Sequence, residues 1–330
     1  MIDELKLAKA CGAKQLIFRD KTMFAIGSTD FKIAVPKEYR GIMGGVNLDW
    51  FLHAVGNNPT KIEGKDGNLV IQDGRFESSS ALLPNNSLTD QLTELRISAN
   101  DVVFELSEIT KQGFLDCAEV TVGALSQKLK YVFLSDNSIL ACDNCYLRKR
   151  HSDLEIGGEL EKGRTINLPV EQIPLKLILK YTDKIVFSEN SVKCKMKKAI
   201  CLLPFSFGDG DMKKLTTILE SKGELFGEST NGFGLAVKRI SQIVANEPVK
   251  LTFKEGGNLK ISACNGHEKA LASVVIPEVT CCVDFEGTCS AKHLARWADC
   301  HGKIYGAMEG RGLLVEHDMG QDLFALFTNS

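Results

Sequence analysis

The sequence predicts an α+β protein of three tandem domains, each built from two units in which a short helix is followed by antiparallel strands. Three observations predict this fold class: a helix-then-strands order that recurs along the chain, turn residues between the strands, and a length of 330 residues. Because a single hydrophobic core stops growing near about 250–300 residues, this length suits more than one domain.

Three segments show the repeat most clearly. Each has an amphipathic helical pattern followed by three short alternating strands, the last ending on an apolar tract, and they recur at a spacing of roughly 120 residues. Their predicted helices are Asn47–Val55, Val170–Leu179 and Ala291–Ala298. Three further units of the same kind lie between them, with helices predicted at Glu4–Cys11, Val122–Leu129 and Leu235–Ala245. The alternative is three unrelated α+β domains, which the matching order in six consecutive units disfavours.

Turn residues separate the predicted strands. Asp66-Gly67 and Asp136-Asn137 are pairs that favour tight hairpins, so the sheets are expected to be antiparallel. Two polar, turn-rich segments, Leu88–Ser98 and Gly208–Ser221, fall outside the repeat. We therefore expect domains at residues 1–92, 93–212 and 213–330.

Composition and charge limit the function classes. The chain has 44% apolar and 25% charged residues, and its net charge of −2 excludes a uniformly basic surface. A local stripe of Lys and Arg on a slightly acidic body remains compatible with binding nucleic acid. No apolar run approaches the ~20 residues that span a bilayer. The opening residues do not resemble a secretory signal, so a cytoplasmic protein is expected.

The cysteines and histidines indicate neither a metal site nor a catalytic site. Cys142 and Cys145 form a lone CxxC with no second pair, whereas a structural zinc site usually needs four ligands. The eleven cysteines are interpreted as small buried apolar residues of a reducing compartment. The six histidines are scattered, and Gly41-Ile-Met-Gly-Gly45 lacks the Lys-Ser/Thr of a phosphate-binding loop. We expect no enzyme, no metal and no cofactor.

Several motifs resemble those of one family along essentially the whole chain. Residues 131–147 have a strand, a turn, a second strand and then Ala141-Cys-Asp-Asn-Cys-Tyr-Leu147. Earlier comes Ala25-Ile-Gly-Ser-Thr-Asp30, and later Gly257-Asn-Leu-Lys-Ile-Ser-Ala-Cys-Asn265. In this order and spacing the motifs resemble the bacterial-type β sliding clamp, the processivity factor of DNA polymerases.

The chain also departs from the family pattern. At residues 141–147 the family has Ala-Thr-Asp-Gly-His-Arg-Leu, of which Ala141, Asp143 and Leu147 are kept. The usual first strand is absent from the N-terminus, and the chain ends Phe327-Thr-Asn-Ser330 where the family has Met-Pro-Met-Arg. The resemblance therefore implies a divergent clamp, bacterial or viral in origin, located in the bacterial or host cytoplasm.

The resemblance implies a DNA-clamp fold that closes into a ring around duplex DNA when two chains dimerise. Such a ring needs basic side chains that contact phosphates without reading sequence. The predicted helices and their ends supply candidates opposite their apolar stripes, although exposed helices also carry lysine simply for solubility. The DNA-binding candidates are Lys6, Lys9, Lys14, Gln127, Lys128, Lys130, Lys176, Lys180, Lys238, Arg239, Lys292 and Arg296.

The resemblance also places a partner site and a dimer interface. An apolar pocket that receives extended peptides from the polymerase and the clamp loader is expected at Leu129, Cys142, Leu147, Met212, Leu215, Ala325 and Phe327. The alternative for Leu129 and Leu147 is the core. The dimer interface is expected to use the edge strand Arg75–Leu82, with Arg75 and Phe76, against Ile243 and Val244. Those last two residues could equally be core.

Two other functions remain open from the sequence. Clamps of the proliferating-cell-nuclear-antigen type have two domains in each chain, whereas three domains imply a dimer that completes six. An adaptor of a different class would use the repeats to bind protein partners without encircling DNA. Substitution of the helix lysines distinguishes a clamp from an adaptor, because the substitutions would not change how an adaptor behaves toward DNA.

Overall fold

The computed structural model describes most of the chain. The described residues are 1–19, 21–56, 61–84, 95–122, 124–126, 129–156, 165–169, 174–188, 191–208, 211–230, 234–244, 248–264, 270–297 and 301–327. They divide into two compact units, residues 1–111 with 156–206 (unit 1) and residues 112–155 with 207–330 (unit 2). The three expected domain boundaries remain a prediction. No described helix is long and apolar enough to cross a membrane.

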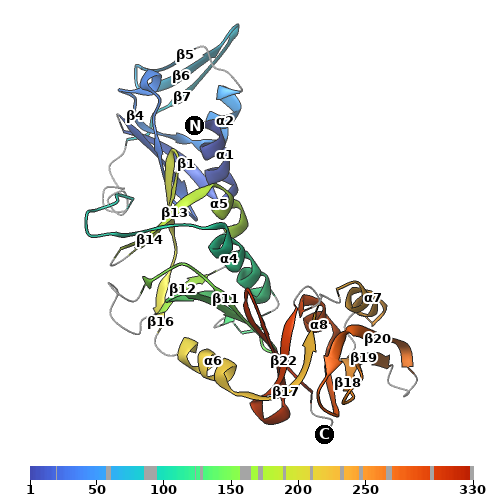
Figure 1. Ribbon diagram of the computed structural model, residues 1–330. Helices are drawn as coiled ribbons and strands as arrows, with labels where there is room; N and C mark the ends of the chain where they lie inside the picture. The colour runs from blue at the N-terminus through green and yellow to red at the C-terminus, as the bar shows by residue number, and fades with distance from the viewer. Residues whose placement is uncertain are drawn as a thin grey trace. The chain divides into compact units, whose positions relative to one another are not determined.

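Unit 1 contains an eight-stranded antiparallel sheet and a separate three-stranded sheet (Figure 1). The larger sheet has the order β4-β1-β2-β3-β15-β14-β13-β8, and the smaller one β5-β6-β7. The N-terminal elements are α1 (Ile2–Ala10), β1 (Ala13–Arg19), β2 (Thr22–Gly27), β3 (Phe31–Ala34), η1 (Lys37–Tyr39), β4 (Met43–Asn47), α2 (Leu48–Val55), β5 (Lys61–Lys65), β6 (Asn68–Asp73) and β7 (Phe76–Ala81). The later ones are β8 (Val102–Glu105), β12 (Thr165–Pro169), α5 (Leu175–Tyr181), β13 (Thr182–Ser188), β14 (Ser191–Met196) and β15 (Ala199–Leu203).

Unit 2 carries a sheet whose strands run in the order β9-β10-β11-β24-β23-β22-β17-β20-β19-β18-β21. Its first elements are α4 (Glu108–Thr121, which begins in unit 1), β9 (Tyr131–Ser135), β10 (Ser138–Cys142), β11 (Tyr146–His151) and, after β16 (Ser206–Gly208), α6 (Asp211–Glu220). Then follow β17 (Lys222–Ser229), α7 (Gly234–Val244), β18 (Pro248–Phe253), β19 (Asn258–Cys264), β20 (Ala270–Cys281), β21 (Phe285–Ser290), α8 (Ala291–Trp297), β22 (Gly302–Ala307), η5 (Met308–Gly310), β23 (Gly312–His317) and β24 (Gly320–Ala325).

The α2 unit shows how local sequence produces the repeat. Asn47 caps the helix, because its side-chain oxygen accepts a hydrogen bond of 3.0 Å from the Trp50 amide. The helix then buries its apolar stripe, and Phe51 meets Phe18 of β1 edge to face at 5.6 Å. After the helix, Asp66 and Gly67 both have positive φ, which the tight β5–β6 turn requires. The predicted helix and hairpin are confirmed here.

Two predictions about helices were wrong. The helix predicted at residues 122–129 is instead α4, which ends at Thr121. Its cap is Ser107, whose hydroxyl accepts a hydrogen bond from the Thr110 amide at 3.1 Å, and Phe114 and Cys117 form its buried side. The segment Gly208–Ser221, predicted as a polar linker, contains α6, because Leu215, Ile218 and Leu219 recur at helical spacing and pack on unit 2.

Candidate functional site

Unit 1 presents four of the candidate DNA-binding lysines on its helices. Lys6 and Lys9 lie on α1, Lys176 and Lys180 on α5, and all four are exposed. Lys9 is partly neutralised, because its amine lies 2.7 Å from the Asp49 carboxylate of α2. The other three form no ion pair with a described residue, so their charges are available to a polyanion.

Unit 2 presents three more exposed candidates on helices, Lys238 and Arg239 on α7 and Lys292 on α8. Arg296, also on α8, is committed elsewhere: its guanidinium donates to an Asp143 carboxylate oxygen at 3.1 Å and to the Glu119 carbonyl at 3.3 Å. Its first role is therefore to hold the β10–β11 turn.

The remaining DNA-binding candidates are not on helices in the described part of the chain. Lys14 lies on β1, and Lys130 lies in the turn before β9. Gln127 and Lys128 lie outside the described residues. The grouping of these residues with the helix lysines remains a prediction.

Apolar residues from the β10–β11 hairpin and α6 meet in unit 2. Leu147, Leu219, Leu314 and Leu323 are buried in one cluster, and Cys142 and Leu215 pack against it while half-buried. Tyr131, Ile218, Tyr305 and Met308 are the other half-buried members. We call these six half-buried residues the apolar patch. The structure thus brings together three of the predicted pocket residues, Cys142, Leu147 and Leu215, with Leu147 as core beneath the patch.

The other predicted pocket residues are spread more widely. Ala325 lies beside the hairpin, since its amide donates to the Cys145 carbonyl at 2.8 Å. Phe327 bridges Thr288 of β21 instead and is exposed. Leu129 is half-buried in the segment before β9, and Met212 lies on α6 with its side chain outside the described residues. The prediction from sequence missed the other four members of the patch, Tyr131, Ile218, Tyr305 and Met308, although the helical spacing of Ile218 was a usable signal.

The β10–β11 turn is held by the Asp143 carboxylate. One oxygen accepts hydrogen bonds from the Cys145 and Tyr146 amides at 2.8 and 2.7 Å, and the other accepts from Arg296. Hydrogen bonds to His293 and the Cys145 amide outweigh the effect of burial and lower the pKa of Asp143. Burial raises the pKa of the Cys142 thiol to about 12, so that side chain is neutral and serves as part of an apolar wall.

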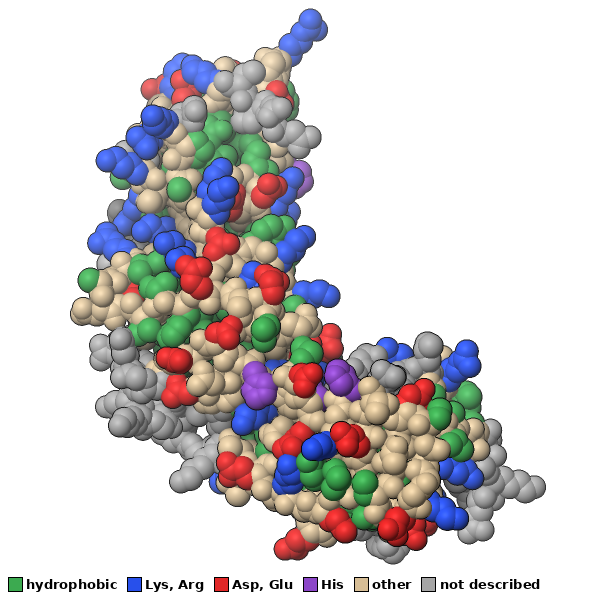
Figure 2. Space-filling view, in the orientation of Figure 1, with side chains coloured by type: hydrophobic (Ala, Val, Ile, Leu, Met, Phe, Trp, Pro, Cys, Tyr) green, Lys and Arg blue, Asp and Glu red, His purple; other side chains and the backbone are tan. Residues whose placement is uncertain are grey.

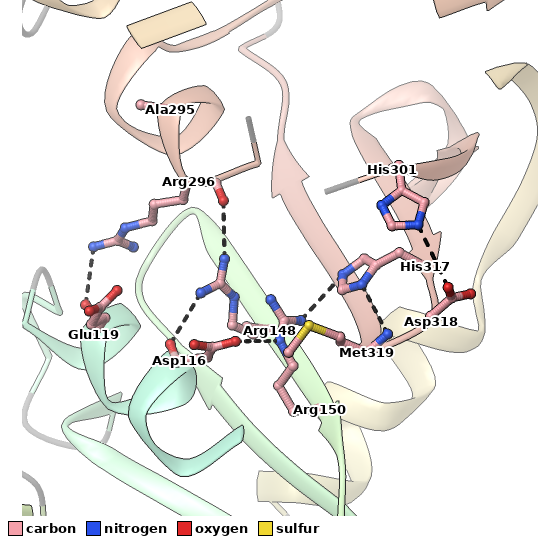
Figure 3. A pocket seen from close by; sticks show the side chains of 10 residues that line it. All are labelled: Asp116, Glu119, Arg148, Arg150, Ala295, Arg296, His301, His317, Asp318 and Met319. Atoms are coloured by element: carbon pink, nitrogen blue, oxygen red, sulfur yellow. Dashed lines mark hydrogen bonds and ion pairs between the residues drawn. The ribbon is translucent and has the colours of Figure 1, made fainter. Parts of the chain in front are cut away.

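A buried ion cluster joins β11 to β24 next to this turn, and Figure 3 shows three of its members, Arg148, Arg150 and His317. Asp322 is fully buried and opposes Arg148 in the strand register. Its oxygens accept from Arg148 Nε at 2.7 Å, the Tyr146 hydroxyl at 2.7 Å, Arg150 Nη2 at 3.0 Å and His317 Nε2 at 2.8 Å. Although burial alone would raise the pKa of Asp322, the two guanidinium groups and His317 hold it far below its usual range.

The surroundings of the cluster are consistent with a structural role. A cavity of about 410 Å³ beside it is lined by both signs of charge, including Arg148, Asp116 and His317 (Figure 3). Arg150 Nε also donates to Asp116 at 3.1 Å, so the guanidinium groups are already paired. At the start of β24, a Cβ on Gly320 would lie 2.1 Å from the Lys149 carbonyl, so only glycine permits this close strand pairing.

Solved structures reveal the fold to which this architecture corresponds. The DNA polymerase sliding clamp of Pseudomonas aeruginosa matches with a TM-score of 0.71 at 12% identity, covering 99% of this chain and 97% of the other. The Helicobacter pylori beta clamp bound to a DNA ligase peptide matches with a TM-score of 0.73 at 14% identity over the same shares. The chain has the fold of the bacterial β sliding clamps. No protein-family model and no curated protein sequence matches it.

The buried ion cluster around Asp322 leads to a testable prediction. Asp322→Asn removes the charge that compensates two buried arginines, so we expect unfolding to become easier by about 3–5 kcal/mol. The pKa of Asp322 is depressed on folding, so its stabilising contribution is present above the unfolded pKa of about 3.9 and is lost as pH falls below it. The variant should therefore show a weaker dependence of Tm on acid than the wild type. Thermal unfolding from neutral to acidic pH measures both effects.

Asp318→Asn is the matched control, because that carboxylate side chain is 93% exposed in the β23–β24 turn, four residues before Asp322. It should leave the Tm unchanged. If Asp322→Asn behaves like this control, the ion cluster does not stabilise the β11–β24 pairing.

Proposed function

We propose that the chain is a DNA sliding clamp, a non-enzymatic ring subunit that encircles duplex DNA and confers processivity on a replicative DNA polymerase. The observation that carries this proposal is the fold, matched over 99% of the chain to DNA polymerase sliding clamps. A closed ring stays on DNA even when each phosphate contact is weak and short-lived, so topology replaces tight binding. Exposed lysines on α1, α5, α7 and α8 supply such contacts.

Strand pairing supports a ring made of two chains. The third strand of one repeat unit, β3, pairs with β15, which is the third strand of a later unit. The same relation joins β11 to β24. Among the described strands, two third strands lack a partner of this kind: β7 is a sheet edge, and β20 meets β17 only over residues 279–281. We propose that β7 of one copy pairs with β20 of a second copy, and the reverse, to close the ring.

Exposed apolar residues lie where this pairing needs them. Phe76 on β7 is 57% exposed, Val275 on β20 is 54% exposed and Ile243 on α7 is 61% exposed. Ile243 and Val275 line a groove of about 490 Å³ between α7 and β20. Ile243 is therefore not a core residue. Arg75 lies exposed in the turn before β7, and the Val244 side chain lies outside the described residues.

The apolar patch is proposed as the docking site for peptides of the polymerase and the clamp loader. Such sites are mostly apolar, and a few anchor residues dominate the binding energy. The solved Helicobacter pylori clamp carries a DNA ligase peptide, which is a precedent for peptide binding on this fold. In this chain α6 brings Leu215 and Ile218 to the patch, and Ser221 ties the helix end to η5 through a hydrogen bond from the Met308 amide.

The first prediction concerns ring closure. Ile243→Ser with Val275→Ser should convert the dimer into a folded monomer, because both changes remove exposed apolar area from the proposed interface. Sedimentation measures the mass, and circular dichroism checks the fold. Val103→Ser, which changes another exposed apolar strand residue, should leave the dimer intact. A stable dimer in the double variant places the interface elsewhere.

The second prediction concerns DNA. Replacing Lys6, Lys176 and Lys238 with Glu should weaken loading on nicked circular DNA and lower the salt slope by about one for each lost phosphate contact. Retention on the circle is measured over a series of salt concentrations, with Lys65→Glu, Lys254→Glu and Lys303→Glu as a charge-matched control away from the helices. Retention equal to the control, with partner binding preserved, would favour the adaptor that does not encircle DNA.

The third prediction concerns partners. Met212→Ser with Leu215→Ser should abolish stimulation of the cognate polymerase while leaving the mass and DNA retention of the dimer unchanged. Lys214→Ser is the control, because Lys214 is an exposed residue of the same helix and does not belong to the apolar cluster. Primer extension by the polymerase measures the effect. Full stimulation by the double variant would mean that the partner docks away from α6.

A further inference from the structure

The large sheet of unit 1 has a second face with a charge pattern of its own. Phe18 of β1 contacts α2, so its side chain lies on the face of the sheet that the helices cover. Met23, which lies opposite Phe18 on β2, is on the same face. On the opposite face, Lys184 of β13 stands directly across from Lys195 of β14. Lys195 is across from Ile200, which is across from Lys32 of β3. Three lysines therefore lie in one row across four adjacent strands.

Three more lysines extend this row at the strand ends. Lys197 and Lys198 form the β14–β15 turn, and Lys21 lies in the β1–β2 turn, all exposed. The turns are neighbours, because the Ala34 amide donates to the Lys198 carbonyl at 3.1 Å and the Val35 amide to the Lys21 carbonyl at 3.2 Å. We call these six residues the lysine face. Figure 2 shows Lys and Arg side chains gathered along the side of unit 1 opposite α1 and α2.

The positive charge of the lysine face is only partly compensated. Lys184 pairs with Glu105, whereas the other five form no ion pair with a described residue. Glu4 lies near Lys198 but pairs with the amino group of Met1. Like charges directly opposite each other, as at Lys184 and Lys195, destabilise a sheet. Partial burial and the neighbouring Arg96 guanidinium lower the pKa of Lys32, a further sign of uncompensated positive charge.

The apolar residues at the centre of the same face are covered, whereas Met43 and Val103 are exposed on the edge strands β4 and β8. Ile17 and Phe24 are buried under Leu95, and Ile200 packs against them. A protein partner usually needs exposed apolar or aromatic anchors, which the centre of this face does not offer. The absence of exposed rings among its described residues also disfavours stacking of bases. What remains is a row of flexible amines suited to phosphates.

We infer that the lysine face is a second nucleic-acid site that binds the phosphate backbone without sequence preference. From β13 to β3 is three strand spacings, roughly 14 Å, which is the axial rise of about four nucleotides of one strand. The face lies on the side of the sheet opposite the helices, so its ligand is a strand other than the duplex proposed for the helix side. The proposed clamp function does not depend on this site.

The test measures binding of a short labelled single strand and a short labelled duplex to the full chain by fluorescence anisotropy, between about 50 and about 200 mM salt. The variant is Lys195→Glu with Lys197→Glu and Lys198→Glu, and the charge-matched control is the Lys65, Lys254 and Lys303 triple. We expect the variant to lose about ten-fold or more in affinity at low salt and about two units of salt slope, since each lost phosphate contact removes about 0.7–0.9 units. The control should lose much less.

Further arms separate this site from the helix side. The Lys6, Lys176 and Lys238 variant should keep the affinity for the short labelled nucleic acids that the lysine-face variant loses. The lysine-face variant should still be retained on nicked circular DNA. Equal losses in the lysine-face variant and the control would overturn the inference. Tighter binding of a labelled polyglutamate peptide than of either nucleic acid to the wild type, with loss of that binding in the variant, would also overturn it. The ligand would then be an acidic protein. If the Glu variant fails to fold, the Ala versions at the same positions carry the same test.

Discussion

The pairing of β11 with β24 depends on one buried carboxylate. Asp322 receives hydrogen bonds from two arginines, a tyrosine and a histidine, and no part of it is exposed. Burying these charges is costly, and the cost is repaid only when every partner is in place. The cluster therefore favours one strand register, with Arg148 opposite Asp322 and Leu147 opposite Leu323. That register sets Leu147 and Leu323 beneath the apolar patch and holds the turn containing Cys142 next to it.

The equivalent pairing in unit 1 is made by different chemistry. Between β3 and β15, Phe31 opposes Cys201 and Ile33 opposes Ala199, all buried and apolar. Burial of apolar area is tolerant of small shifts, whereas an ion cluster with fixed hydrogen-bond directions is not. The repeat thus uses one topology with two kinds of contact, and the more directional one lies beside the proposed partner site.

Charge is distributed unevenly although the chain as a whole is nearly neutral. The exposed helix residues Lys6, Lys176 and Lys238 are the proposed contacts for a duplex, while the lysine face carries positive charge on the other side of the unit 1 sheet. The net charge of −2 does not reveal these two groups of lysines, because carboxylates elsewhere in the chain offset their charge. Local fields, rather than net charge, decide where a polyanion binds.

The sequence by itself determined the elements whose signals are local. The cap of Asn47, the hairpin at Asp66-Gly67 and the recurrence of helix and strands act within a few residues, so they could be predicted together with the α+β class. Prediction failed at α4, where the Ser107 cap was overlooked, and at α6, which lies outside the repeat. Only the tertiary structure decided that Arg148 meets Asp322 and that Lys195 of β14 lies in one row with Lys32 of β3. Such pairs depend on strand register between segments far apart in the chain, and a single sequence carries no local signal for that register.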